Sequence, residues 1–258
     1  MKLTTVIGSV NNNPAYYKFI PKQIAFWRHF NINFVAIYIH VPSSDSGIPE
    51  ELQPYIETGN IIIWDKTPQI NTVFQAQMLR VLYAGLLALD DTELVMITDM
   101  DMLPCSAPYY TSGLADFEKR DFLYYRSISE TNKEIYMCYN AAHPSVWSQI
   151  FGITSLDDIS KVLTELYTGK DYSGIPGGAG WCIDQRFLYD KLINYPYLRV
   201  MNRPIKRLEV KQYNRLLQLG NTNFYHTFDD AHFHRNFTKN ADLIANAEKQ
   251  LGIKTTNI

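Results

Sequence analysis

Short apolar runs that alternate with helical patterns constrain the fold of the first hundred residues. Four runs, rich in β-branched side chains and each the length of one strand, cover residues 3–7, 33–40, 61–64 and 94–97. Helical patterns separate them, including one after Pro14 and a long one over residues 73–89. Strands that are apolar on both faces and alternate with helices are typical of a parallel, doubly wound α/β sheet. Such sheets bind ligands outside the carboxyl ends of their strands.

The alternation stops after Pro104. Residues 122–125 and 135–139 are predicted strands separated by a polar turn, so the second half of the sheet should be mixed or antiparallel. Helices are predicted to begin after Ser155, which is a plausible N-cap, and over residues 186–193. A last helix or tail covers the C-terminus. With 258 residues and no internal repeat or linker, the chain is expected to form a single α/β domain with a mixed sheet flanked by helices.

Two aspartates follow the fourth apolar run, in the segment Asp99-Met100-Asp101. Residues two apart in an extended chain point to the same side at about 6–7 Å, so both carboxylates can converge on one target while Met100 points away. A buried anion needs a partner, and hard oxygen ligands suit Mg²⁺ or Mn²⁺. The alternative is a solvated turn, because Asp is common where strands end.

Arg80 is the only charged residue between Thr67 and Leu89. A helix that is apolar nearly all round is a buried helix, so this arginine needs a partner. One interpretation is a structural ion pair with Asp65 or Asp99. The other is a contact to a phosphate or to the acidic site, which the planar guanidinium group favours.

A glycine-rich segment, residues 174–180, precedes Trp181 and leads to Asp184 and Gln185. Glycines allow the backbone to approach a ligand closely or to adopt positive φ. Asp184 lies where the next predicted helix begins, and the helix dipole stabilises a carboxylate there. We expect Asp184 either to cap this helix or to face a substrate.

Half of the six histidines fall within residues 226–234. His232 and His234 share a side if the chain is extended, and an imidazole is a good third ligand for a site otherwise made of carboxylates. A surface loop with histidines that bind nothing is the alternative.

Charge and cysteine usage narrow the class of protein. A net charge of −2 predicts neither a nucleic-acid nor an anionic-membrane surface. Cys105, Cys138 and Cys182 are widely spaced and contain no CxxC pair, which favours reduced thiols over a zinc site. The N-terminal apolar run is too short for a signal sequence, and no segment approaches the roughly 20 apolar residues of a membrane span. We therefore expect a cytoplasmic protein.

The buried strand with Asp99-Met100-Asp101, the glycine-rich segment before Trp181-Cys182-Ile183-Asp184-Gln185, and the late histidines occur in that order. The ordered set resembles the GT-A class of nucleotide-sugar-dependent glycosyltransferases over residues 1–240. The resemblance implies that the Asp99-Met100-Asp101 element contacts the donor and that its two carboxylates, Asp99 and Asp101, hold Mn²⁺ or Mg²⁺ against the donor diphosphate. It also implies that His232 or His234 completes the metal shell, and His232 is preferred because it follows Asp229-Asp230 directly.

The resemblance implies further roles for the two halves of the domain. Residues 1–104 would bind the nucleotide sugar, residues 105–240 the acceptor, and residues 241–258 would form the terminal helix or tail. Asp184 would be the catalytic residue, as general base in an inverting reaction or by positioning the sugar in a retaining one. The other donor-binding positions would be Val6, Ile7, Gly8, Arg80, Gly178, Trp181 and Gln185.

The implied activity is transfer of a sugar from a nucleoside diphosphate sugar, most commonly linked to UDP, to a hydroxyl of a glycan or another acceptor. Two alternatives fit a similar sheet. One is a metal-dependent nucleotidyltransferase or phosphohydrolase, and the other is a non-catalytic module that binds a sugar or a nucleotide.

Overall fold

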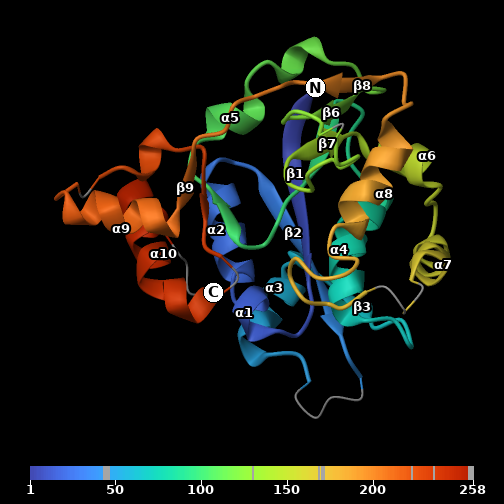
Figure 1. Cartoon of the computed structure of the whole chain (residues 1–258), viewed down its shortest axis with the longest axis horizontal. Coiled ribbons are helices and arrows are strands. Elements are labelled where there is room, and N and C mark those ends of the chain that lie inside the picture. The colour runs from blue at the N-terminus through green and yellow to red at the C-terminus, as the bar shows by residue number, and fades with distance from the viewer. Residues whose placement is uncertain are drawn as a thin grey trace.

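A seven-stranded sheet in the order β3-β2-β1-β4-β7-β6-β8 runs through the computed structural model, which describes residues 1–42, 47–129, 131–167, 169, 172–221, 223–234 and 236–254. Figure 1 shows this sheet between two groups of helices. The strands are β1 (Lys2–Val10), β2 (Asn33–His40), β3 (Ile61–Asp65), β4 (Glu93–Ile97), β6 (Phe122–Tyr124), β7 (Asn140–Ala142) and β8 (Leu198–Val200). Strands β1 to β4 are parallel, β7 is antiparallel to β4 and to β6, and β8 is parallel to β6.

The central strands are buried on both faces because helices cover both. Along β1, Val6 belongs to one hydrophobic core and Ile7 to the other. The first core is closed by α1 (Pro14–Tyr17), α2 (Ile20–His29), α3 (Gln53–Glu57), α5 (Ala107–Thr111), α9 (Val210–Gln218) and α10 (Phe237–Leu251). The second is closed by α4 (Thr72–Tyr83), α6 (Pro144–Phe151), α7 (Leu156–Leu166) and α8 (Ile183–Leu192). The chain is thus a three-layer α/β fold.

A second, three-stranded sheet joins segments that are far apart in the sequence. It consists of β5 (Met102–Pro104), β10 (Asp230–His232) and β9 (Arg207–Glu209). In its register His232 is paired with Met102 on one side and with Glu209 on the other. The sheet therefore carries the late histidines to the segment that follows the two aspartates.

The main features of the predicted architecture are confirmed. The first half of the sheet is parallel, the second half is mixed, and the terminal helix is present as α10. Helix α7 begins where it was predicted, and the Ser155 side chain accepts a hydrogen bond from the backbone N–H of Asp158. The helix predicted after Pro14 is two helices, α1 and α2, and the long helix ends at Tyr83 before a 3₁₀ turn, Ala84–Leu86.

The strand predicted over residues 135–139 is wrong. Tyr139 has a φ of 69°, a left-handed conformation that ends any extended run, and β7 begins only at Asn140. The Asn140 side chain donates to the backbone carbonyls of Tyr136 and Met137, so this segment satisfies its polar groups as a turn.

All three cysteines are free thiols. Over the described ranges, none of the helices has the length and apolar character needed to cross a membrane.

Two glycines that neighbouring residues approach closely provide a stability prediction. A Cβ at Gly85 would lie 2.8 Å from the backbone nitrogen of Ser148, which cannot move without shifting α6, whereas a Cβ at Gly8 would meet the flexible thioether of Met100 at 2.7 Å. We expect Gly85→Ala to lower the free energy of unfolding by about 1–3 kcal/mol, and Gly8→Ala to cost less. Urea denaturation of both variants checks this, and an equal loss in the two would contradict it.

Candidate active site

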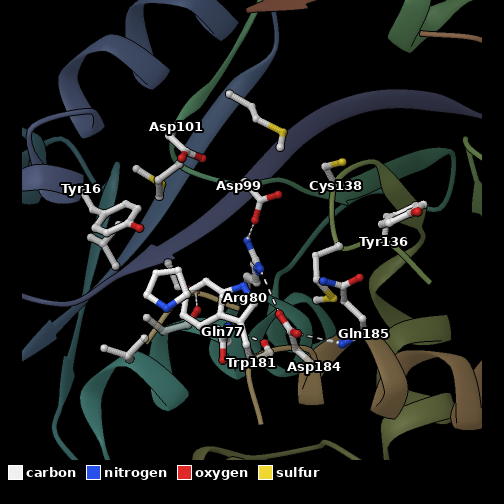
Figure 2. Close-up of a pocket in the computed structure, with 18 of the residues that line it drawn as sticks. Tyr16, Gln77, Arg80, Asp99, Asp101, Tyr136, Cys138, Trp181, Asp184 and Gln185 are labelled. Atoms are coloured by element: carbon white, nitrogen blue, oxygen red, sulfur yellow. Dashed lines mark hydrogen bonds and ion pairs between the residues drawn. The ribbon is translucent and has the colours of Figure 1, made fainter. Parts of the chain in front are cut away.

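A cleft of about 780 Å³ opens at the carboxyl ends of β1 and β4. At this point the strand order reverses, because β2 and β3 continue on one side of β1 while β4 lies on the other. Ligands of open α/β sheets bind at such a switch point. Side chains from both halves of the chain line the cleft. Figure 2 shows Tyr16, Gln77, Arg80, Asp99, Asp101, Tyr136, Cys138, Trp181, Asp184 and Gln185. Ser9, Asn11, Arg126 and His232 also line it.

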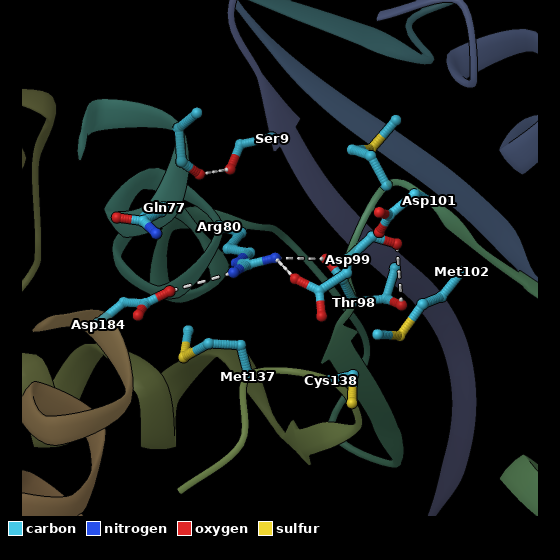
Figure 3. A network of polar contacts seen from close by, with 12 residues as sticks. Ser9, Gln77, Arg80, Thr98, Asp99, Asp101, Met102, Met137, Cys138 and Asp184 are labelled. Atoms are coloured by element: carbon cyan, nitrogen blue, oxygen red, sulfur yellow. Dashed lines mark hydrogen bonds and ion pairs between the residues drawn. The ribbon is translucent and has the colours of Figure 1, made fainter. Parts of the chain in front are cut away.

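Arg80 lies at the centre of this cleft, between two carboxylates (Figure 3). Its Nη1 donates to the Asp99 carboxylate and to the backbone carbonyl of Thr98, the latter at 3.2 Å. Its Nη2 donates to Asp184 Oδ2 at 3.1 Å. Burial opposes the charge of the guanidinium group, but the two neighbouring carboxylates outweigh it and raise the pKa of Arg80. The ion pair expected with Asp99 is therefore present, and the same group also reaches the acidic site.

Asp184 is 2% exposed and lies in the first turn of α8. Its Oδ1 accepts a hydrogen bond of 2.9 Å from the backbone N–H of Gln185, and its Oδ2 faces Arg80. Burial raises the pKa of Asp184 to about 6, with Arg80 acting in the opposite direction and Asp99 adding to the rise. The carboxylate is therefore charged above this pH and becomes protonated below it.

The two aspartates after β4 have different partners. Asp99 contacts Arg80 on α4, whereas Asp101 Oδ2 lies 3.5 Å from His232 Nε2 on β10. The backbone between them is held by the buried side chain of Gln23, whose Nε2 donates to the carbonyls of Met100 and Met102 at 2.9 and 2.8 Å. This turn is consequently a fixed part of the cleft wall and not a solvated loop end.

The structure distinguishes the two late histidines. His232 lines the cleft, and its Nδ1 lies 3.4 Å from Glu209 Oε1 while its Nε2 faces Asp101. Burial disfavours a charge on this ring, but the hydrogen bond to Asp101 and the charge of Glu209 raise the pKa of His232. The side chain of His234 is 58% exposed and does not line the cleft, although its Nε2 lies 2.7 Å from Glu209 Oε2.

Asp101 and His232 fit a divalent cation as neighbouring ligands. Ligands of one ion with bonds of about 2.1 Å are separated by about 3.0–3.4 Å, close to the 3.5 Å between Asp101 Oδ2 and His232 Nε2. Asp99 contacts Arg80 through Oδ1, so Oδ2 is the atom with which it could reach a shared ion. Within the described residues, however, three ligand atoms lie within 4.8 Å of one another only in Glu209, His232 and His234.

Four predicted donor-binding residues do not line the cleft. Val6 and Ile7 are fully buried within the sheet, Gly8 packs beneath Met100, and Gly178 lies outside the lining, where Gly174 takes part instead. The physical reason is the length of β1, which ends at Val10 and not at residue 7. Its carboxyl end therefore comes three residues later, and the cleft is lined there by Ser9, Val10, Asn11 and Asn13.

Sequence reasoning missed two cleft arginines, Arg126 and Arg207. Arg207 donates to Asp230 at 2.6 Å in a buried ion pair. The guanidinium group of Arg126 lies 4.5 Å above the centre of the Tyr136 ring, and its Nη1 donates to Cys138 Sγ at 3.5 Å. Among the described side chains no carboxylate pairs with Arg126. Its position directly after the predicted strand over residues 122–125 is the one signal that could have identified it.

No protein-family model and no curated protein sequence matches the chain. Several solved structures, however, are similar to the chain. The galactosyltransferase LgtC, in complex with donor and acceptor sugar analogues, aligns over 96% of this chain and 95% of that chain, with 14% identity and a TM-score of 0.49. The apo form of the glycosyltransferase GlyE of Streptococcus pneumoniae TIGR4 aligns over 98% of this chain and 61% of that one, with 12% identity and a TM-score of 0.48.

A glycosyltransferase involved in glycosylation of the major capsid of PBCV-1 aligns over 98% of this chain and 99% of that chain, with 10% identity and a TM-score of 0.45. All three alignments cover almost the whole length of this chain.

Proposed function

We propose that the protein is a metal-dependent glycosyltransferase that moves a sugar from a UDP-linked donor to an acceptor hydroxyl. The observation that carries this proposal is the line of ionic contacts from Asp99 through Arg80 to Asp184, beside Asp101 and His232. These contacts bring together, in one cleft, side chains that could bind a cation, a fixed positive charge and a carboxylate of raised pKa. The cleft volume of about 780 Å³ is within the range of small-molecule sites, about 300–1,000 Å³.

The leaving group of such a reaction is a diphosphate. Asp101 and His232, with Asp99, are the residues that would hold Mn²⁺ or Mg²⁺ there, and a bound ion would neutralise the charge that grows as the sugar–phosphate bond breaks. Arg126 adds a cation to the same cleft that no described carboxylate neutralises. A guanidinium group in this position can donate to phosphate oxygens.

Asp184 is suited to bind hydroxyl groups. A carboxylate has about four acceptor sites, of which one faces Arg80 and one the N–H of Gln185. The remaining sites can accept a hydrogen bond from the transferred sugar or from the acceptor. When the acceptor hydroxyl is the donor, the same carboxylate can remove its proton as a general base.

The carboxyl end of β1 supplies the polar groups for the nucleoside. Asn11 donates from Nδ2 to Thr72 Oγ1 at 3.1 Å, and the Asn13 side chain caps α1. Both line the cleft together with Tyr16. Fixed amide groups and an aromatic ring at a switch point provide hydrogen bonds and a flat face for a base and ribose.

Calorimetry with UDP, with and without Mn²⁺, tests this proposal. We expect UDP to bind the wild type only with Mn²⁺, and Asp101→Ala to lose this binding while remaining folded by circular dichroism. Asp65→Ala is the matched control, because Asp65 is the last residue of β3 in the same sheet, its side chain is 78% exposed, and it does not line the cleft. Equal affinity of the wild type and Asp101→Ala, with or without Mn²⁺, would sink the assignment.

Product analysis separates this activity from the alternatives. Incubation of UDP-sugars with Mn²⁺ and an acceptor panel should release UDP. Release of pyrophosphate or phosphate from a nucleoside triphosphate would instead indicate a nucleotidyltransferase or a phosphohydrolase. An intact donor would indicate a binding module.

A further inference from the structure

Glu209, His232 and His234 form a compact group of possible metal ligands. Parallel pairing of β9 with β10 places Glu209 opposite His232, and His234 follows two residues later. Each residue offers one ligand atom, and these atoms all lie within 4.8 Å of one another. Glu209 Oε2 is 2.7 Å from His234 Nε2 and 3.3 Å from His232 Nδ1, and the two rings are 4.2 Å apart between centroids.

Two further features mark this group. Glu209 Oε2 is enclosed, and the polar atoms nearest to it are the two histidine nitrogens, so all three possible ligand atoms face the same point. His234 has a φ of 37°. A non-glycine residue in such a conformation costs about 1–3 kcal/mol.

The chemistry of the group selects the kind of ion. Two imidazole nitrogens and one carboxylate oxygen are borderline ligands that suit Zn²⁺, whereas Mg²⁺ prefers oxygen alone. A tetrahedral zinc ion with bonds of about 2.0–2.1 Å separates its ligands by about 3.3 Å. The distance between Glu209 Oε2 and His232 Nδ1 matches this value at 3.3 Å, whereas the 2.7 Å between Glu209 Oε2 and His234 Nε2 would have to lengthen by about 0.6 Å when the ion binds. Three protein ligands would leave one position for water.

We propose that Glu209, His232 and His234 form a zinc-class cation site, separate from the Asp99–Asp101 turn. His232 binds the ion through Nδ1, so its Nε2 carries the proton and faces Asp101 Oδ2 at 3.5 Å. A carboxylate that orients a ligating histidine from the far side of the ring is the usual support of a zinc site. Both this site and the proposed Mn²⁺ or Mg²⁺ site at Asp99 and Asp101 use His232. His232 therefore cannot bind zinc and coordinate the second ion at the same time.

Titration of metal-free protein with Zn²⁺ alone, against a competing chromogenic chelator, tests this site. We expect one tightly bound Zn²⁺ per chain. His234→Ala and Glu209→Gln should each weaken Zn²⁺ binding by about tenfold or more. Loss of a residue that only supports a metal ligand already costs about tenfold in affinity, and loss of a ligand itself should cost at least as much. Replacement by Co²⁺ should give the intense visible bands of a four-coordinate ion, and these bands should be lost in both variants.

Two controls locate the ion. His226→Ala removes an exposed histidine outside the group, and Asp99→Asn alters the other candidate metal site; both should bind Zn²⁺ like the wild type. Unchanged Zn²⁺ affinity in His234→Ala would overturn the proposal, as would loss of Zn²⁺ in Asp99→Asn with retention in His234→Ala. The titration contains no nucleotide, so a failure of the UDP experiment leaves its result unaffected.

Discussion

Replacement of Arg80 by Met is expected to lower the free energy of unfolding by about 3–5 kcal/mol, the usual cost of removing one partner from a buried ion pair. Arg80 is 7% exposed and neutralises two carboxylates, one of which is the fully buried Asp184. Without it, Asp184 must either remain charged in an apolar wall or take up a proton, and its pKa should rise above about 6. Urea denaturation at pH 8 measures the effect.

The double variant Arg80→Met/Asp184→Asn tests the cause of this loss. It removes the buried anion together with its partner, so it should be more stable than Arg80→Met alone. Arg120→Met is the matched control, because Arg120 forms an exposed pair with Glu118, and such pairs contribute about 0–1 kcal/mol. If Arg80→Met unfolds at the same urea concentration as the wild type, the ion pairs do not hold this part of the cleft together.

Asp184→Asn is expected to reduce kcat/KM for sugar transfer by about 10²- to 10⁴-fold, the contribution of a positioned acid–base group. The amide keeps the shape of the side chain but loses the charge and most of the acceptor capacity. Since burial raises the pKa of Asp184 to about 6, the wild-type rate should increase as pH rises through this value, when the carboxylate forms. Initial rates between pH 5 and 8 measure both effects.

The control for this variant is Asp190→Asn, which changes an exposed carboxylate on the same helix α8. It should keep the wild-type rate and pH profile. A step in the rate near pH 6 that persists in Asp184→Asn would assign the ionisation to another group, and full activity of that variant would remove Asp184 from the mechanism.

The parallel half of the fold could be predicted because its signals are local. Each of the first four strands is a short apolar run bounded by polar residues, and α4 is apolar nearly all round. The strand predicted over residues 135–139 failed for a different reason. Its apolar composition suits a strand, but the conformation of Tyr139 and the hydrogen bonds of Asn140 turn the backbone, and neither is visible in hydrophobic periodicity.

The candidate site residues also divide into those that local signals single out and contacts that they do not reveal. Arg80 stood out as an isolated charge on an apolar helix, and Asp99 and Asp101 stood out at the end of a buried strand, so general costs of burying charge sufficed to single them out. The partners of these charges could not be assigned from the sequence. Asp184 is 104 residues from Arg80 along the chain, and only the tertiary fold brings their side chains to 3.1 Å.

The sequence by itself determined which residues carry charge into an apolar environment and that the first half forms a parallel sheet open at its carboxyl edge. Only the tertiary structure decided what each charge meets. The pairing of β10 with β5 and β9 places His232 between Asp101 and Glu209, and it leaves His234 outside the cleft. Local propensities act over a few residues, whereas strand register and helix packing depend on the whole core. That is why several residues of the cleft could be anticipated from the sequence, whereas its full lining and its geometry could not.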